Sequence, residues 1–337
     1  MTTHPIPEGF ADDAGWLVQA VDPKSRLVRL IRLDRDGYRA ASFLDDRMLQ
    51  QAPESRICAL NDLLRVAERL PDDAQWIFHI GHVGSTLVSR LLGEADPVLA
   101  IREPRSLRDL AMTDAARVPE LAAGLRRLMA RVFAPGQMAQ IKATSFVSEL
   151  APLLVAPGSS ALFLFATPRN YVASILAGEN STKELRILEQ SRAARLKSRG
   201  IVLDGFDRSD AHRAAAAWAC EMTSLEAAAA AMPDRRILWA DFDRMLRDMA
   251  GALGACARHF AVQLDSGRAE AIARGPLMHR YSKALEYDYS PALRAELLAE
   301  ATSHHAPDID QAVAGLYRAA AASPLLSRSL QRAERED

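Results

Sequence analysis

The chain contains 337 residues, of which 49% are hydrophobic and 25% are charged. This size and composition suit one large α/β domain with attachments or two modest domains, and they argue against disorder over most of the chain. The formal net charge is −1, which argues against a duplex nucleic-acid binder, because such proteins depend on broad neutralisation of phosphates. We therefore expect no nucleic-acid partner, and any anion site must be local.

The first residues and the cysteines give expectations about location. The N-terminal stretch has no basic start and no apolar core, and no apolar run in the chain is long enough to cross a bilayer. We therefore expect neither a secretory signal nor a membrane partner. Cys58, Cys220 and Cys256 are far apart and form no CxxC motif, so we predict reduced, buried thiols in a cytoplasmic protein.

The N-terminal part reads as a small β unit followed by a helix. Residues 15–44 alternate apolar and polar positions, which predicts three strands with turns at Asp22-Pro23 and Asp36-Gly37. Residues 54–69 carry apolar side chains at helical spacing and predict an amphipathic helix. We assign both to an N-terminal unit at residues 1–70.

From residue 75 onward, strand and helix patterns alternate. The predicted strands lie near residues 75–80, 97–101, 138–142, 160–166 and 235–240. This alternation predicts right-handed crossovers and an α/β fold in which a parallel sheet of about five strands is covered by helices on both faces. We predict that this domain spans residues 71–290.

The remaining segments read as mostly helical. The alanine-rich stretch 211–231 predicts a helix that Trp218 anchors to the core. After residue 241 the pattern is mostly helical, with an interruption at residues 279–290. We assign residues 291–337 to a C-terminal helical extension, and we expect its charged end, residues 327–337, to be frayed and solvated.

A glycine-rich turn follows the first predicted strand of the sheet. Gly81 and Gly84 free the backbone to turn sharply, and Ser85 and Thr86 open an amphipathic helix. The first N–H groups of such a helix lack internal partners, so the turn predicts a phosphate or sulfate site. An ATP-binding GxxxxGK[ST] loop would place lysine directly after the last glycine, whereas Ser85 stands there.

Polar groups follow the other strands of the predicted sheet. Ligands of open parallel sheets bind beyond the carboxyl ends of the strands. Those ends carry Arg102-Glu103-Pro104, Lys142-Ala143-Thr144, the segment 167–170 leading to Ser174, and Asp241. We therefore expect a site for anion binding or proton transfer at this edge of the sheet.

These segments, taken in order, resemble the sulfotransferase family over roughly residues 75–285. GHVGSTLVSRLL resembles the PxSGTTLxxxLL loop, and the segment around Glu103 resembles the acidic segment after the second strand. IKAT, which contains Lys142, resembles the KxP segment, FATPRNYVASIL resembles RDPRDxxxS, and ILWADFDRML resembles VRYEDL. Tyr281-Ser282-Lys283 is similar to the late serine-lysine loop. The motifs are most like those of bacterial and tyrosylprotein sulfotransferases.

The resemblance implies a three-layer P-loop-type fold and transfer of a sulfuryl group from 3′-phosphoadenosine 5′-phosphosulfate (PAPS), with adenosine 3′,5′-bisphosphate as product. The acceptor would be a hydroxyl or amine of a small molecule, glycan or peptide, and no metal is expected. Glu103 would take the acceptor's proton, while Lys142 and His82 would stabilise the transferred group. The cofactor-binding residues implied are Gly81, His82, Val83, Gly84, Ser85, Thr86, Arg169, Ser174, Ser282 and Lys283. The chain departs from the family at His82 and Ala166, where the family has basic residues.

Other readings remain open at this stage. The same loop suits a P-loop phosphotransferase or nucleotide hydrolase without its lysine, or a non-catalytic binder of an anion or nucleotide. Glu103 would also suit the first turn of a helix, Lys142 a solvated strand end, and Ser174 a helix face bonded to its own backbone. The basic run 183–199 suits a solvated helix face, or alternatively an acceptor- or partner-binding surface.

Overall fold

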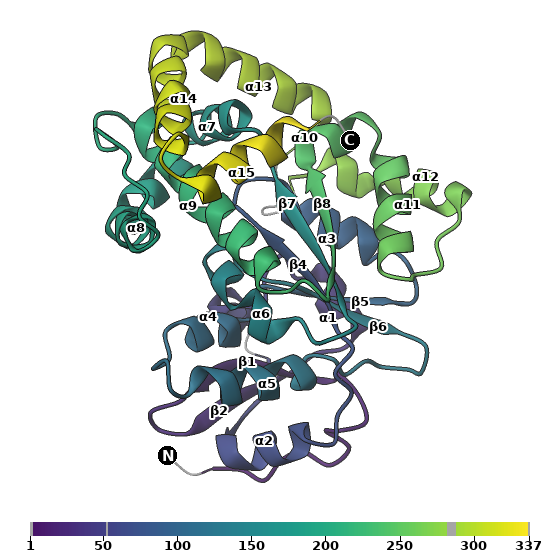
Figure 1. Cartoon of the computed structure of the whole chain (residues 1–337). Coiled ribbons are helices and arrows are strands. Elements are labelled where there is room, and N and C mark those ends of the chain that lie inside the picture. Colours follow the sequence, from purple (N-terminus) through teal and green to yellow (C-terminus); the bar gives the residue numbers. More distant parts are fainter. Residues whose placement is uncertain (1–2, 52, 282–287, 336–337) are drawn as a thin grey trace.

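The computed structural model describes residues 3–51, 53–281 and 288–335 and is drawn in Figure 1. Its centre is a five-stranded sheet with all neighbours parallel, in the order β5-β6-β4-β7-β8. The strands are β4 (Gln75–His79), β5 (Val98–Arg102), β6 (Met138–Lys142), β7 (Ser160–Phe165) and β8 (Arg236–Asp241). Every residue of β5 and β7 is buried, as in strands covered on both faces. The predicted sheet is confirmed, and each strand boundary agrees within one residue.

Helices connect these strands or follow the last of them, and they cover both faces of the sheet (Figure 1). They are α3 (Ser85–Leu92), α4 (Arg105–Ala111), α5 (Val118–Leu128), α6 (Ala151–Leu154), α7 (Pro168–Leu176), α8 (Glu179–Ser198), α9 (Asp210–Ala230), α10 (Phe242–Arg247), α11 (Met249–His259) and α12 (Ser266–Ala273). The alanine-rich helix is confirmed as α9. Trp218 of α9 is fully buried, and its indole N–H donates to the Ala166 carbonyl at 2.9 Å. The three cysteines are free and buried, as predicted.

The N-terminal unit differs from its prediction. It forms an antiparallel sheet of β1 (Trp16–Asp22), β2 (Leu27–Arg32) and β3 (Ser55–Ala59). The predicted third strand and its Asp36-Gly37 turn are wrong, because that segment forms helix α1 (Arg35–Ala40). The Asp34 side chain caps α1 by accepting a hydrogen bond from the Gly37 N–H at 2.7 Å.

The predicted helix at residues 54–69 is also only partly right. The helix is α2 (Leu60–Ala67), and the preceding residues form β3 instead. Ile57 fits the helical spacing of the apolar residues, yet it lies opposite Arg29 in the ladder between β3 and β2. Pairing with the exposed edge of β2 satisfies the backbone groups of this segment, and a local pattern cannot reveal such a distant partner.

Two buried arginines attach the N-terminal unit to the main domain. Arg131 donates to the carbonyls of Phe10, Asp13 and Trp16 at 2.6, 3.1 and 2.7 Å. Arg102, at the end of β5, donates to the carbonyls of Tyr38, Arg39 and Ala41. Each guanidinium therefore satisfies several backbone carbonyls that helix and strand ladders leave unpaired.

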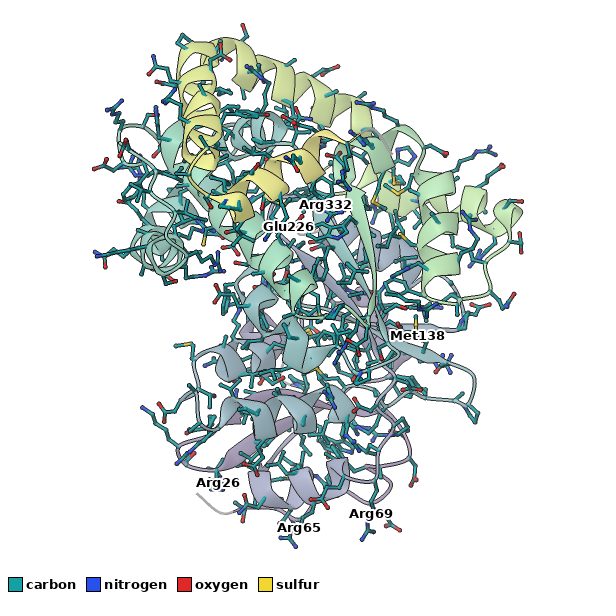
Figure 2. The ribbon with its side chains drawn as sticks, in the orientation of Figure 1. Arg26, Arg65, Arg69, Met138, Glu226 and Arg332 are labelled. Carbon is teal, nitrogen blue, oxygen red and sulfur yellow. The ribbon has the colours of Figure 1, made fainter. Side chains whose placement is uncertain are left out.

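The C-terminal helices are α13 (Pro291–His304), α14 (Ala306–Ala320) and α15 (Pro324–Glu334). The expectation of a frayed, solvated end is wrong, because α15 packs on α9 with Leu326 and Leu330 buried. Arg332 donates to Glu226 of α9 at 2.8 Å (Figure 2). Its guanidinium carbon lies 4.5 Å from the ring centre of Trp239. Apolar side chains at helical spacing outweigh the charged composition of this segment. None of the described helices is long and apolar enough to cross a membrane.

We expect Arg131→Met to lower the free energy of unfolding by about 3 kcal/mol, because it leaves several buried carbonyls without a donor. Unfolding in urea measures this loss. The matched control is Arg65→Met, in which the lost ion pair with Asp62 is largely exposed (Figure 2); it should change stability by less than about 0.5 kcal/mol. Similar losses in the two variants would contradict the anchoring role of Arg131.

Candidate functional site

The turn between β4 and α3 has an unusual backbone. Gly81, His82 and Gly84 all have positive φ angles, of 85°, 53° and 60°. Such angles are rare outside glycine, so His82 adopts a strained conformation that its surroundings must hold. Helix α3 then begins at Ser85 without a side-chain cap. Its first N–H groups therefore lack intrahelical partners, as the anion-site prediction requires.

Phe242 packs directly against this turn. It is the first residue of α10, just after β8, and a Cβ atom added to Gly84 would come within 1.9 Å of its ring. The guanidinium of Arg294 lies 5.2 Å from the centre of the same ring. Arg294 is held by Asp243, whose other carboxylate oxygen accepts from the Asn170 amide at 3.0 Å. Contacts with α7 and α13 thus hold the segment of α10 that packs on the turn.

A buried ion pair lies at the ends of β5 and β6. Lys142 is 1% exposed and donates to Oε1 of Glu103, which is 8% exposed. The Glu103 backbone N–H donates to the Lys142 carbonyl at 2.8 Å, and Glu103 has a φ of 48°. This geometry excludes a solvated lysine, and it excludes a first-turn role for Glu103, because α4 begins at Arg105. A second cation, the guanidinium of Arg108, lies 4.0 Å from Oε2 of Glu103.

His79 connects the turn to the ion pair. Its Nδ1 accepts from the Gly81 N–H at 3.0 Å, and its Nε2 lies 3.0 Å from the carbonyl of Ala143. Because the first partner is a donor and the second an acceptor, the ring is neutral with its proton on Nε2. His79 thus ties the backbone of the turn to the residue that follows Lys142.

His82 turns toward α8. Its Nδ1 lies 3.2 Å from Ser181 Oγ, and its Nε2 lies 3.6 Å from a carboxylate oxygen of Glu184. The residue thus lines the site, but these two contacts are with α8. Its predicted role in stabilising a transferred group stays a prediction.

The turn, the ion pair and both histidines line one cleft of about 630 Å³, together with Arg108, Phe242 and Arg294. Its lining includes Glu103, Lys142 and Ser174 together with every residue from 81 to 86. The Ser174 hydroxyl donates to the carbonyl of Tyr171 at 2.8 Å. Ser174 therefore bonds to the backbone of its own helix and also lines the cleft.

The remaining residues at the predicted site are Arg169, Ser282, Lys283 and Asp241. Arg169 is absent from the described lining of the cleft and pairs with Asp310 of α14. Ser282 and Lys283 lie outside the described residues. Asp241, at the end of β8, caps α10 by accepting from the Arg244 N–H at 3.0 Å, and burial raises the pKa of its carboxyl. The fifth strand end therefore supplies a helix cap.

The lining of the cleft also includes residues that no sequence motif predicted, among them Phe43, Arg47, Arg108 and Arg294. Arg47 stacks on Phe43, with its guanidinium carbon 3.6 Å from the ring centre, and donates to Asp45. Burial by itself would raise the pKa of Asp45, but hydrogen bonds from Arg47 and the charge of Arg108 outweigh it and hold that pKa below its ordinary value. No motif marks these residues, because they reach the cleft only through the packing of the N-terminal unit, α4 and α13.

The basic run on α8 is not a simple solvated face. Arg192, Arg195 and Arg199 are at least partly buried and pair with Glu221 and Glu149. Arg192 and Arg195 are buried because they pair with Glu221, a buried carboxylate of α9. The charge pattern of α8 alone could not predict a partner on another helix. No group of three His, Cys, Asp or Glu side chains suited to a metal is present among the described residues.

Comparisons with known proteins find distant structural similarity. No protein-family model matches the chain, and no curated protein matches it. Among solved structures, the chain is similar to a sulfotransferase domain from the curacin biosynthetic pathway, at 12% sequence identity and a TM-score of 0.42. The similarity covers 71% of this chain and 98% of that domain. A similarity of this size carries no argument about function.

We expect Gly84→Ala to lower stability by about 3 kcal/mol, because it adds a left-handed alanine and a clash with Phe242. Gly136→Ala is the matched control, since Gly136 also has a positive φ of 81° but has no atom within 4 Å of an added Cβ. It should cost only about 1 kcal/mol.

A double-mutant cycle tests the clash itself. In a Phe242→Ala background, the cost of Gly84→Ala in urea unfolding should fall to that of Gly136→Ala. An unchanged cost would mean that Phe242 does not limit this position.

Proposed function

We propose that the protein transfers a sulfuryl group from PAPS to a hydroxyl or amine of an acceptor. The observation that carries this proposal is the buried Glu103–Lys142 pair, which lies in the same cleft as the uncapped start of α3. One part of the cleft offers a proton acceptor and the other offers donors for an anion. Transfer of a sulfuryl group to a nucleophile that bears a proton needs both.

The residues of the turn suit a phosphosulfate. The backbone N–H groups of residues 81–86 would cradle the 5′-phosphate. Thr86 Oγ is buried without a hydrogen-bond partner among the described residues, although Thr86 lines the cleft. An orphaned hydroxyl there is explained by a ligand that accepts its hydrogen bond.

We assign the 3′-phosphate side to Ser174 and Arg294. Arg294 lines the cleft and Arg169 is absent from its described lining, so Arg294 takes over the role that the family motif gave to Arg169. Ser282 and Lys283 keep their proposed role over the nucleotide.

PAPS, when bound, supplies a sulfuryl group activated by its anhydride link to phosphate. Glu103 would accept the proton of the attacking hydroxyl or amine, using Oε2, while Oε1 stays bonded to Lys142. Lys142 holds that carboxylate in place, and it brings positive charge to the base of the cleft. His79 fixes the backbone on either side of this arrangement. Catalysis by these residues rests on positioning and on preorganised charge.

Thermal unfolding with nucleotides tests the proposal. Adenosine 3′,5′-bisphosphate at a hundred times its dissociation constant should stabilise the protein by about 2.7 kcal/mol, since it binds only the folded state. ATP with magnesium should give no comparable shift. The reverse pattern would favour a phosphotransferase or nucleotide hydrolase and reject sulfuryl transfer.

Thr86→Val is the informative variant for this measurement. It removes a hydroxyl that has no described partner in the free protein, so stability should hold or rise. Binding of the bisphosphate should weaken roughly tenfold, because one hydrogen bond to an anion is lost. Unchanged affinity would place the nucleotide elsewhere.

Glu103→Gln should cut turnover by roughly 10² to 10⁴, the range for loss of a general base, and leave bisphosphate binding nearly intact. Turnover is followed as sulfate transfer from radiolabelled PAPS to acceptors from a hydroxyl and amine library. The control is Asp310→Asn, which removes an ion-paired carboxylate outside the cleft and should keep full turnover. If Glu103→Gln retains turnover, Glu103 is structural.

A further inference from the structure

Three cations and two carboxylates lie together around the proposed general base. Lys142 donates to Oε1 of Glu103, and Arg47 donates to both carboxylate oxygens of Asp45. Each carboxylate thus has a hydrogen-bonded cation of its own. Arg108 lies farther from both, with Nη2 3.8 Å from Asp45 and 4.0 Å from Oε2 of Glu103. Arg108 therefore brings one surplus positive charge to this group.

The guanidinium of Arg108 faces the cleft. Arg108 lines the cleft, as does Glu103 beside it, and 41% of the Arg108 side chain is exposed. Both of its ion-pair distances exceed the range of a hydrogen bond. Its Nε is buried without a partner, but neither terminal Nη group is among the fully buried atoms that lack one, so both keep accessible surface. Arg108 therefore presents donors for an anion next to Oε2 of Glu103.

An acceptor that covers Arg108 must replace the water around its charge. A neutral acceptor would leave the guanidinium without hydrogen bonds in a space that the acceptor closes to water, which costs free energy. An anionic acceptor supplies charge-assisted hydrogen bonds, which are the strong ones. The single surplus charge matches a singly charged carboxylate. The cleft therefore favours an acceptor with a carboxylate over its neutral analogue.

We propose that the acceptor is a hydroxy acid whose carboxylate binds Arg108 while its hydroxyl lies against Oε2 of Glu103. This inference rests on the proposed function, in which Glu103 accepts the proton of the attacking hydroxyl. Nη2 of Arg108 and Oε2 of Glu103 are 4.0 Å apart, so parallel hydrogen bonds to them place the two ligand oxygens about 4 Å apart. That spacing suits a hydroxyl on the first or second carbon after the carboxylate. The acceptor is thus a 2- or 3-hydroxy acid, and Arg108 selects it.

The transfer to such an acceptor is balanced by the groups already described. The hydroxyl oxygen forms a bond to the sulfur of PAPS as the bond from that sulfur to the phosphate oxygen breaks. The proton of the hydroxyl goes to Glu103, and adenosine 3′,5′-bisphosphate leaves. The product is the sulfate ester of the hydroxy acid, with its carboxylate unchanged.

Isothermal titration calorimetry with the full chain tests the site without requiring transfer. The probe is 3-hydroxyoctanoate, whose chain suits the apolar side chains of Phe43 and Phe146 in the same cleft. Its primary amide has the same chain and hydroxyl without the charge, and it should bind roughly tenfold more weakly. Equal affinity for the acid and the amide would overturn the proposal.

Variants of α4 locate the bound carboxylate. Arg108→Met should lower the affinity for the acid to that for the amide, whereas Arg108→Lys keeps the charge and should restore part of the preference. Arg105→Met is the matched control, because Arg105 is equally exposed, at 42%, but pairs with Asp46 and Asp109 and is absent from the described lining of the cleft. It should keep the preference for the acid. If Arg108→Met also keeps it, another group binds the carboxylate and the proposal is wrong. Should Arg108→Met fail to fold, the comparison of acid and amide decides alone.

Transfer from radiolabelled PAPS separates this inference from the proposed function. The acid should have a kcat/KM roughly tenfold above that of the amide, and Arg108→Met should remove the difference by raising KM for the acid alone. Equal slowing of both acceptors would mean that Arg108 acts on the sulfuryl group, which would overturn the inference. If neither acceptor is sulfated while binding of the acid depends on Arg108, sulfuryl transfer is rejected and the hydroxy-acid site is retained.

Discussion

The parallel pairing of β5 with β6 is the constraint on which the site depends. In this register Arg102 lies opposite Lys142, so the residue after Arg102 is delivered to the Lys142 side chain. The Glu103 N–H continues the ladder by donating to the Lys142 carbonyl, and the left-handed turn at Glu103 then directs its carboxylate to the ammonium group. Both groups are almost fully buried, and removing one partner would leave an uncompensated charge. The register, the strained backbone and the ion pair therefore stabilise one another.

Arg102, the last residue of β5, and Glu103, which follows it, have different roles. Arg102 holds the carbonyls of α1 and its C-terminal neighbour, while Glu103 enters the cleft. The N-terminal unit is attached through Arg102 and Arg131, and it contributes Phe43 and Arg47 to the wall beside Lys142. This small β unit is therefore part of the site, although it comes before the sheet in the chain and has no motif of its own.

Ion pairs along helix α8 hold it in place beside the cleft. One carboxylate oxygen of Glu184 lies 3.6 Å from Nε2 of His82, and the other lies 3.9 Å from Nη2 of Arg192. Farther along α8, Arg195 and Arg199 share Glu149, and Arg195 also pairs with Glu221. Opposite charges between α8 and α9 thus set the position of α8, which lines the cleft.

The sequence by itself determined the central sheet, the glycine turn before α3 and the neighbouring places of Glu103 and Lys142. These follow from buried apolar runs, from glycines at a tight turn, and from the rule that parallel strands end at one edge. Only the tertiary structure decided which edge β3 would pair with, that Asp34 would cap α1, and that α15 would pack on α9. It also brought Phe43, Arg47, Arg108 and Arg294 into the cleft, left Arg169 with Asp310, and buried the arginines of α8. The physical reason is that strand and turn signals are local, whereas ion pairs, edge pairing and cleft walls join residues from distant segments.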